Sequence, residues 1–199
     1  MANLPPLSPH PKAELFRQQL GARSVVLVGM PGSGKSSIGR RLSQRLGLDF
    51  ADADTEIERA ANMTIPEIFR LRGEAEFRAG EQRVIARLLE SGPLVLATGG
   101  GAFINADTRA KVKQSAVSVW LKADVETLLK RVKRKANRPL LQNDDPEGTL
   151  RNMLAAREPF YAEADLTVTS CEIPHEMVVE EIVRQLEAKL EREAAGASS

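Results

Sequence analysis

Residues 29–37, with the sequence Gly-Met-Pro-Gly-Ser-Gly-Lys-Ser-Ser, combine the residue types that bind phosphate groups. They contain the complete phosphate-loop pattern, in which a glycine is followed after four residues by Gly-Lys-Ser. Glycines let backbone N–H groups turn toward phosphate oxygens, Lys35 adds a charge for the β- and γ-phosphates, and the Ser36 hydroxyl suits Mg²⁺. The segment predicts a nucleoside triphosphate site, but it does not identify the molecule that accepts the phosphate.

Two carboxylates, Asp52 and Asp54, follow the next apolar run of the sequence. Beside a phosphate site, such a pair could divide two tasks. One carboxylate could hold Mg²⁺, which prefers oxygen ligands, and the other could accept the proton of an acceptor hydroxyl. A pair of solvated loop aspartates has the same pattern, so the residues alone leave both interpretations open.

Arginines are candidates for gripping an acidic group. Arg78 and Glu81 lie three residues apart on a predicted helix, which fits either a surface ion pair or an arginine oriented to bind a carboxylate. Arg157 lies just before Pro159, where we expect the helix to break, and it could face a ligand or complement the helix dipole.

Two loops are further candidates. The polar segment 133–148 contains Arg138 and has the length of an active-site lid, whose arginine could stabilise a transferring phosphoryl group. A solvated basic patch is the alternative. Gly99-Gly100-Gly101 follows an apolar run, so this loop either turns or lets a ligand approach bare backbone.

Short apolar runs that alternate with helical patterns are typical of a parallel sheet between two layers of helices. We therefore expect a three-layer α/β/α fold with five parallel strands. The expected strands are 25–28, 48–51, 94–97, 117–121 and 166–168. The expected helices are 35–46, 55–63, 64–69, 74–90, 124–132, 150–156 and one that begins at 174. The loops at 29–36, 52–54 and 99–101 all follow strands and should meet at one edge of the sheet.

Composition excludes several classes. The chain has 199 residues, enough for one domain, and its formal charge of +1 and aromatic content of 4% argue against a nucleic-acid-binding protein. One cysteine and two histidines make a disulfide framework or a zinc site improbable. The sequence shows no secretory signal and no apolar run of the roughly 20 residues that a membrane span needs, so we expect a cytoplasmic protein.

Taken together, these motifs resemble those of the bacterial shikimate kinase family. The likeness runs from about residue 24 to residue 185 and includes the phosphate loop, the Asp-x-Asp pair, the Arg78 helix, the three glycines, Arg138-Pro139-Leu140-Leu141 and Arg157-x-Pro159-x-Tyr161. Each motif is weak alone, whereas the ordered set is specific. The resemblance implies a P-loop NTPase fold like that of nucleoside monophosphate kinases, with a mobile lid.

The resemblance also implies an activity, the phosphorylation of the 3-hydroxyl of shikimate by ATP with Mg²⁺, in aromatic amino-acid biosynthesis. Lys35, Asp54 and Arg138 would be catalytic, and Ser36 and Asp52 would hold Mg²⁺. The implied nucleotide-binding residues are Gly32, Ser33, Gly34, Lys35, Ser36, Ser37, Arg131 and Arg138. The implied shikimate-binding residues are Asp54, Arg78, Gly99, Gly100, Gly101 and Arg157.

The implied organisation is a monomer without nucleic-acid or membrane partners. Residues 1–22 would be a flexible lead-in, residues 23–190 a single kinase domain and residues 191–199 a flexible tail. Within the domain, shikimate would bind at about 54–84, and the lid would span about 133–148.

Three rival functions remain open on the residues alone. One is a kinase for another small acceptor such as gluconate or a nucleoside monophosphate. The second is a non-catalytic nucleotide-binding regulator, which would be expected to lack Lys35, Asp54 or the lid arginine, all of which are present. The third, an ATPase acting on RNA or DNA, is disfavoured by the near-zero net charge.

Overall fold

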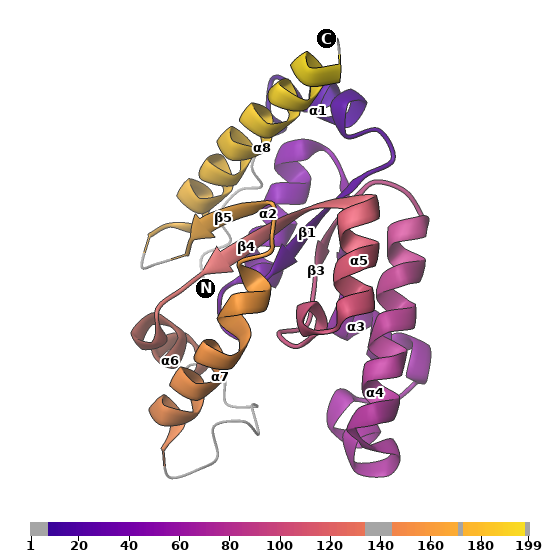
Figure 1. The fold of residues 1–199 in the computed structure, drawn as a ribbon, viewed down its shortest axis with the longest axis vertical. Coiled ribbons are helices and arrows are strands. Elements are labelled where there is room, and N and C mark those ends of the chain that lie inside the picture. The colour runs from indigo at the N-terminus through magenta and orange to yellow at the C-terminus, as the bar shows by residue number, and fades with distance from the viewer. Residues whose placement is uncertain (1–7, 134–144, 171–172, 198–199) are drawn as a thin grey trace.

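The computed structural model describes residues 8–133, 145–170 and 173–197. Its centre is a sheet of five parallel strands in the order β2-β3-β1-β4-β5 (Figure 1). The strands are β1 (Ser24–Val28), β2 (Asp49–Asp52), β3 (Leu94–Ala97), β4 (Ala116–Lys122) and β5 (Leu166–Thr169). All five expected strands are confirmed, with ends that differ by at most one residue.

Helices cover both faces of the sheet, so the expected three-layer α/β/α class is confirmed. One face packs against α1 (Ala13–Leu20), α2 (Lys35–Leu46) and α8 (His175–Ala197). The other face packs against the remaining elements, which are α3 (Ala53–Ala61), α4 (Ile65–Glu90), the 3₁₀ helix η1 (Ala102–Ile104), α5 (Ala106–Ser115), α6 (Val125–Lys133) and α7 (Pro146–Tyr161).

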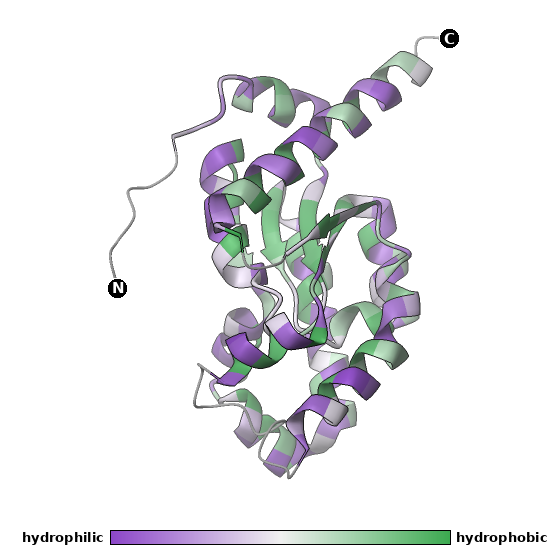
Figure 2. Cartoon of the chain, turned by 90° about the vertical axis from the view of Figure 1, so that its left-hand side faces the viewer, coloured by the Kyte–Doolittle hydropathy of each residue, from purple (hydrophilic) through white to green (hydrophobic). Residues whose placement is uncertain are grey.

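Strand β1 lies in the middle of the sheet and is fully buried. Side chains alternate along a strand, so Val25 and Leu27 enter the core under α2 and α8, whereas Val26 and Val28 enter the core under α3 and α4. A strand that is covered on both faces needs apolar residues at every position, which explains the continuous apolar run. Figure 2 shows the same distribution, with hydrophobic strands inside and polar helix faces outside.

Helix α2 begins directly after the phosphate loop. Gly34 precedes it in the left-handed conformation (φ 99°), and Gly47 ends it in the same conformation (φ 65°). Its residues Ile38, Leu42 and Leu46 are fully buried, as their spacing of four predicts. The positive end of the helix dipole is therefore directed at the loop.

Helix α4 is bent, and this bend joins two helices that sequence analysis placed separately. Gly73 has φ 82° and ψ 171°, outside the helical region, and a side chain would be strained there. The first half begins at Thr64, whose side chain accepts from the Glu67 N–H, while the Glu67 side chain accepts from the Thr64 N–H. This capping box confirms the predicted helix start.

Three expectations about helix ends are wrong. Residues 13–20, expected within a flexible lead-in, form α1, and α8 continues to Ala197 through most of the expected flexible tail. Helix α7 does not break before Pro159 but continues to Tyr161. Proline removes only one N–H donor, and in the last turn of a helix this loss affects a single hydrogen bond.

Within the described residues, every helix is too short or too polar to cross a membrane.

Packing of α1 against the domain gives the first testable prediction. Phe16 is 1% exposed and belongs to the core between α1, α2 and α8. Phe16→Ala should lower the free energy of unfolding by about 3 kcal/mol, because it leaves a cavity. Leu15→Ala is the matched control, since Leu15 is 43% exposed. Equal denaturant midpoints for the two variants would show that α1 does not contribute to stability.

Candidate active site

The phosphate loop already holds its lysine in place. Lys35 is 8% exposed, and its Nζ donates to the carbonyl oxygens of Gly29 (2.7 Å) and Met30 (2.9 Å). These bonds keep the ammonium inside the loop, where the helix dipole and the loop N–H groups also favour negative charge. The loop is consequently an anion site with a buried cation at its centre.

Ser36 and Asp52 lie next to each other at the edge of the sheet. The Ser36 hydroxyl donates to Asp52 Oδ2 at 2.5 Å, and Asp52 Oδ1 accepts from the Asp54 N–H at 3.1 Å. Asp52 is thus both the last residue of β2 and the N-cap of α3. A hydroxyl beside a carboxylate is a pair of hard oxygen donors, which is the chemistry that Mg²⁺ prefers.

Gly99 brings two further carboxylates together. A Cβ built on Gly99 would lie 2.6 Å from Glu81 Oε1 and 3.0 Å from Asp54 Oδ1. Both oxygens therefore face the bare backbone at the end of β3, and only glycine leaves room for them. The sequence pattern of three glycines indicated such a close approach but not the groups that make it.

Arg78 is held by two carboxylates of its own helix. Its guanidinium donates to Glu81 Oε2 at 2.7 Å and to Glu74 Oε1 at 3.3 Å. The same guanidinium lies against Gly101, where a Cβ would be 2.6 Å from Arg78 Nη1. Arg78 remains one-third exposed, so it is oriented by the protein and still accessible to a ligand.

Glu81 is the most buried carboxylate of the site, with 3% of its surface exposed. Burial raises its pKa above the ordinary value, and the ion pair with Arg78 opposes this shift only in part. Its Oε1 has no hydrogen-bond partner among the described residues. Sequence analysis treated Glu81 only as an ion-pair partner and gave no sign of this burial.

Arg157 reaches the same place from α7. Its Nη1 donates to the Gly100 carbonyl oxygen at 3.2 Å, and the Tyr161 hydroxyl donates to the same oxygen at 2.5 Å. The helix that continues past Pro159 positions both residues, one turn apart. Arg157 and Arg78 thus flank the loop of three glycines, as we expect if both arginines bind the same acidic group.

Arg131 joins α6 to the phosphate loop. Its Nη1 donates to Ser170 Oγ (3.0 Å) and lies 3.4 Å from the Ser33 carbonyl oxygen, which also accepts from Ser170 Oγ (2.8 Å). Ser170 follows β5, and sequence analysis did not predict its bond to Ser33, because nothing local marks a contact with a residue 137 positions away. These hydrogen bonds hold Arg131 beside the phosphate loop.

The expected site residues fall into two groups. Those within the described residues lie around one edge of the sheet, at the ends of β1, β2 and β3, in the first turns of α2 and α3, and on α4, α6 and α7. Arg138 lies outside the described residues, as does most of the expected lid. In the described part of the chain, no group of three or more histidine, cysteine, aspartate or glutamate side chains could hold a metal ion on its own.

Fold and site together define a small-molecule kinase with a phosphate loop. The sequence profile of the shikimate kinase family matches residues 31–187, and the chain belongs to this family. It is 58% identical to the shikimate kinase of Bradyrhizobium diazoefficiens over 93% of this chain and 89% of that protein. The shikimate kinase of Rhodopseudomonas palustris is also 58% identical, over 84% of this chain and 82% of that protein.

A solved structure gives the same result. The shikimate kinase of Acinetobacter baumannii, in complex with shikimate, has a TM-score of 0.82 to this structure and is 39% identical. The likeness covers 87% of this chain and 98% of that chain. The expected family and the expected P-loop kinase fold are therefore confirmed.

The raised pKa of Glu81 predicts a pH dependence of stability. A carboxyl whose pKa is higher in the folded chain than in the unfolded chain favours folding below its ordinary pKa of 4.5, and this contribution is lost as the pH rises through the folded pKa. Glu81→Gln does not ionise. The free energy of unfolding of the wild type, relative to this variant, should therefore fall as the pH rises from the ordinary pKa of 4.5 through the raised pKa of Glu81 in the folded chain.

Denaturant titrations at a series of pH values measure this difference. The matched control is Glu74→Gln, which removes the other carboxylate bonded to Arg78 from a position that is 69% exposed. A difference between wild type and Glu81→Gln that stays constant over the pH range would contradict the prediction.

Proposed function

We propose a division of roles among the residues by which this chain phosphorylates shikimate with ATP. The observation that supports it best is the arrangement around Gly99-Gly100-Gly101. Two arginines on different helices flank this loop, and the carboxylate of Asp54 faces its first glycine. Shikimate has one carboxylate and three hydroxyls, so it needs cationic groups at one end and an acceptor oxygen at the other.

On the acceptor side, Arg78 and Arg157 bind the shikimate carboxylate, and the glycine loop contributes backbone contacts. Arg78 is kept in position by Glu81 and Arg157 by the Gly100 carbonyl, so neither side chain needs much reordering when the substrate binds. Asp54 binds the hydroxyls and receives the proton of the 3-hydroxyl as it attacks the γ-phosphate.

On the nucleotide side, the segment from Gly32 to Ser37 surrounds the phosphates of ATP. Lys35 moves its ammonium from the loop carbonyls to the β- and γ-phosphates, where it offsets the charge that builds up in transfer. Arg131, held beside the loop by Ser170, packs against adenine. The Lys35 ammonium is buried, and its attraction to the phosphates is stronger there than in water, because the dielectric constant inside a protein is lower.

Ser36 and Asp52 would hold Mg²⁺. Their oxygens are adjacent at the start of α2, and both are hard donors of the kind that this ion takes. When bound, the ion neutralises charge on the β- and γ-phosphate oxygens. Asp52 also caps the N-terminus of α3, so the same residue fixes the start of the helix that carries Asp54.

Arg138 is proposed to close over the phosphates as part of a lid at about 133–148, on the strength of the family motif. Residues 23–190 are proposed to act as one kinase domain that binds shikimate at about 54–84. The chain is further proposed to work as a monomer in the cytoplasm.

Acceptor choice is the direct test. ADP release from MgATP is measured with shikimate, gluconate or CMP as acceptor. Shikimate alone should stimulate release strongly, because gluconate carries its carboxylate on a flexible open chain that must be ordered on binding, and CMP brings a phosphate. Lys35→Ala should lower the rate with shikimate by about 100-fold or more, since it deletes a charge directed at the transferring group. Equal stimulation by gluconate would refute the selectivity for shikimate that this arrangement of Asp54, Arg78 and Arg157 predicts.

Arg157 is tested separately from the chemical step. Arg157→Ala should raise the KM for shikimate by about tenfold or more, because a charged hydrogen bond is lost, and should leave the KM for ATP nearly unchanged. Arg151→Ala on the same helix is the matched control, since Arg151 is 66% exposed and bonds to Glu147 of its own helix. If both variants have the wild-type KM for shikimate, Arg157 is not part of the clamp.

A further inference from the structure

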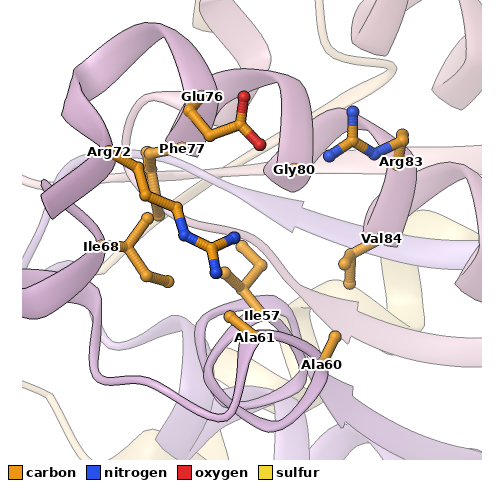
Figure 3. A pocket seen from close by; sticks show the side chains of 10 residues that line it. All are labelled: Ile57, Ala60, Ala61, Ile68, Arg72, Glu76, Phe77, Gly80, Arg83 and Val84. Atoms are coloured by element: carbon orange, nitrogen blue, oxygen red, sulfur yellow. The ribbon is translucent and has the colours of Figure 1, made fainter.

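A cavity of about 180 Å³ lies between α3 and α4, outside the site described above (Figure 3). Glu76, Gly80 and Arg83 of α4 line it, and their spacing of four and three places them on one face of the helix. Arg78 lies on the opposite face, turned toward the glycine loop. The cavity is therefore separate from the acceptor clamp, although the same helix forms one wall of each.

The walls of the cavity are apolar. Ile57 and Ala61 of α3 face Ile68, Phe77 and Val84 of α4 across it. This space is open to solvent at the side where Arg72, Glu76 and Arg83 lie, and its volume exceeds the roughly 150 Å³ of an enclosed apolar cavity that binds benzene. The space between α3 and α4 consequently fits an apolar body of the size of one aromatic ring.

Gly80 keeps this space open. A Cβ at this position would meet no atom within 4 Å, so packing does not require glycine here. Backbone conformation does not require it either, because the φ of Gly80 is not positive. Glycine destabilises the interior of a helix relative to alanine. Here it leaves the part of the lining at residue 80 without a side chain.

Charged groups surround the mouth. Arg72, Glu76 and Arg83 are exposed, and none of their side chains has a hydrogen-bond or ion-pair partner among the described residues. Other arginines of the same helix do have partners, since Arg78 bonds to Glu81 and Arg87 bonds to Glu56. Figure 3 shows the guanidinium groups of Arg72 and Arg83 directed toward the cavity from two sides. The mouth has one more positive than negative charge and favours an anion.

We propose that this cavity is a second, non-catalytic binding site for a small organic acid anion with a ring-sized apolar body. The ring enters the space beside Gly80, and the carboxylate bonds to Arg72 and Arg83 at the mouth. The proposal goes beyond the phosphorylation of shikimate, and its test needs no turnover.

Benzoate is the probe, measured by titration calorimetry against the full chain in the presence of saturating shikimate. Shikimate occupies the clamp and so prevents benzoate from binding there. One saturable site with a dissociation constant on the order of 1 mM is expected. Benzamide has the same ring without the charge and should bind at least tenfold more weakly. Loss of benzoate binding on addition of shikimate would assign it to the clamp and overturn the proposal.

Variants locate the site. Arg72→Ala and Arg83→Ala should each weaken benzoate binding by about tenfold, whereas Arg70→Ala, an exposed arginine of the same helix that does not line the cavity, should not. Gly80→Leu fills the cavity and should abolish binding. It also replaces glycine by a good helix former, so the variant should remain folded, which thermal unfolding checks.

Each remaining outcome overturns part of the proposal. The absence of saturable benzoate binding, or binding that Gly80→Leu leaves unchanged, overturns the cavity as a site. Equal affinity for benzoate and benzamide, or wild-type affinity in both arginine variants, overturns its preference for an anion.

Discussion

The parallel pairing of β1 between β3 and β4 is the constraint on which the site depends. It brings the loops that follow these strands to one edge of the sheet, so their backbones must pass close to one another. A Cβ on Gly29 would lie 2.8 Å from the Leu121 carbonyl oxygen, and one on Gly100 would lie 2.7 Å from the Pro31 ring. The glycines are thus needed for convergence itself, which is why the loops after β1 and β3 carry them.

Charge is concentrated at this edge although the chain as a whole is almost neutral, with a formal charge of +1. Backbone carbonyls hold the cations in place: Lys35 bonds to Gly29 and Met30, and Arg157 bonds to Gly100. Because these bonds are made by the protein alone, the cations are positioned in advance, and less ordering is needed when an anion arrives. The mouth of the cavity between α3 and α4 differs, since its charged groups have no such partners among the described residues.

Local patterns predicted most of this fold, because each depends on residues that are neighbours in the chain. The buried strand β1 and the capping box at Thr64 are examples. Helix α1 was missed since it is short and only its packing against α2 and α8 stabilises it. The bonds from Ser170 to Ser33 and from Tyr161 to Gly100 join residues 137 and 61 positions apart, so no local pattern could indicate them. The expected site residues belong to local motifs, whereas the burial of Glu81 depends on the packed structure.

One aromatic contact has a practical consequence. Trp120 on β4 is the single tryptophan of the chain, and its ring centroid lies 6.0 Å from that of Tyr161, the single tyrosine. Tyr161 in turn bonds to the carbonyl of Gly100, in the loop that faces the acceptor. The chain therefore contains one tryptophan fluorophore, which is buried and is linked to the loop of three glycines through Tyr161. Its emission reports on this loop without any attached dye, and no second tryptophan contributes background.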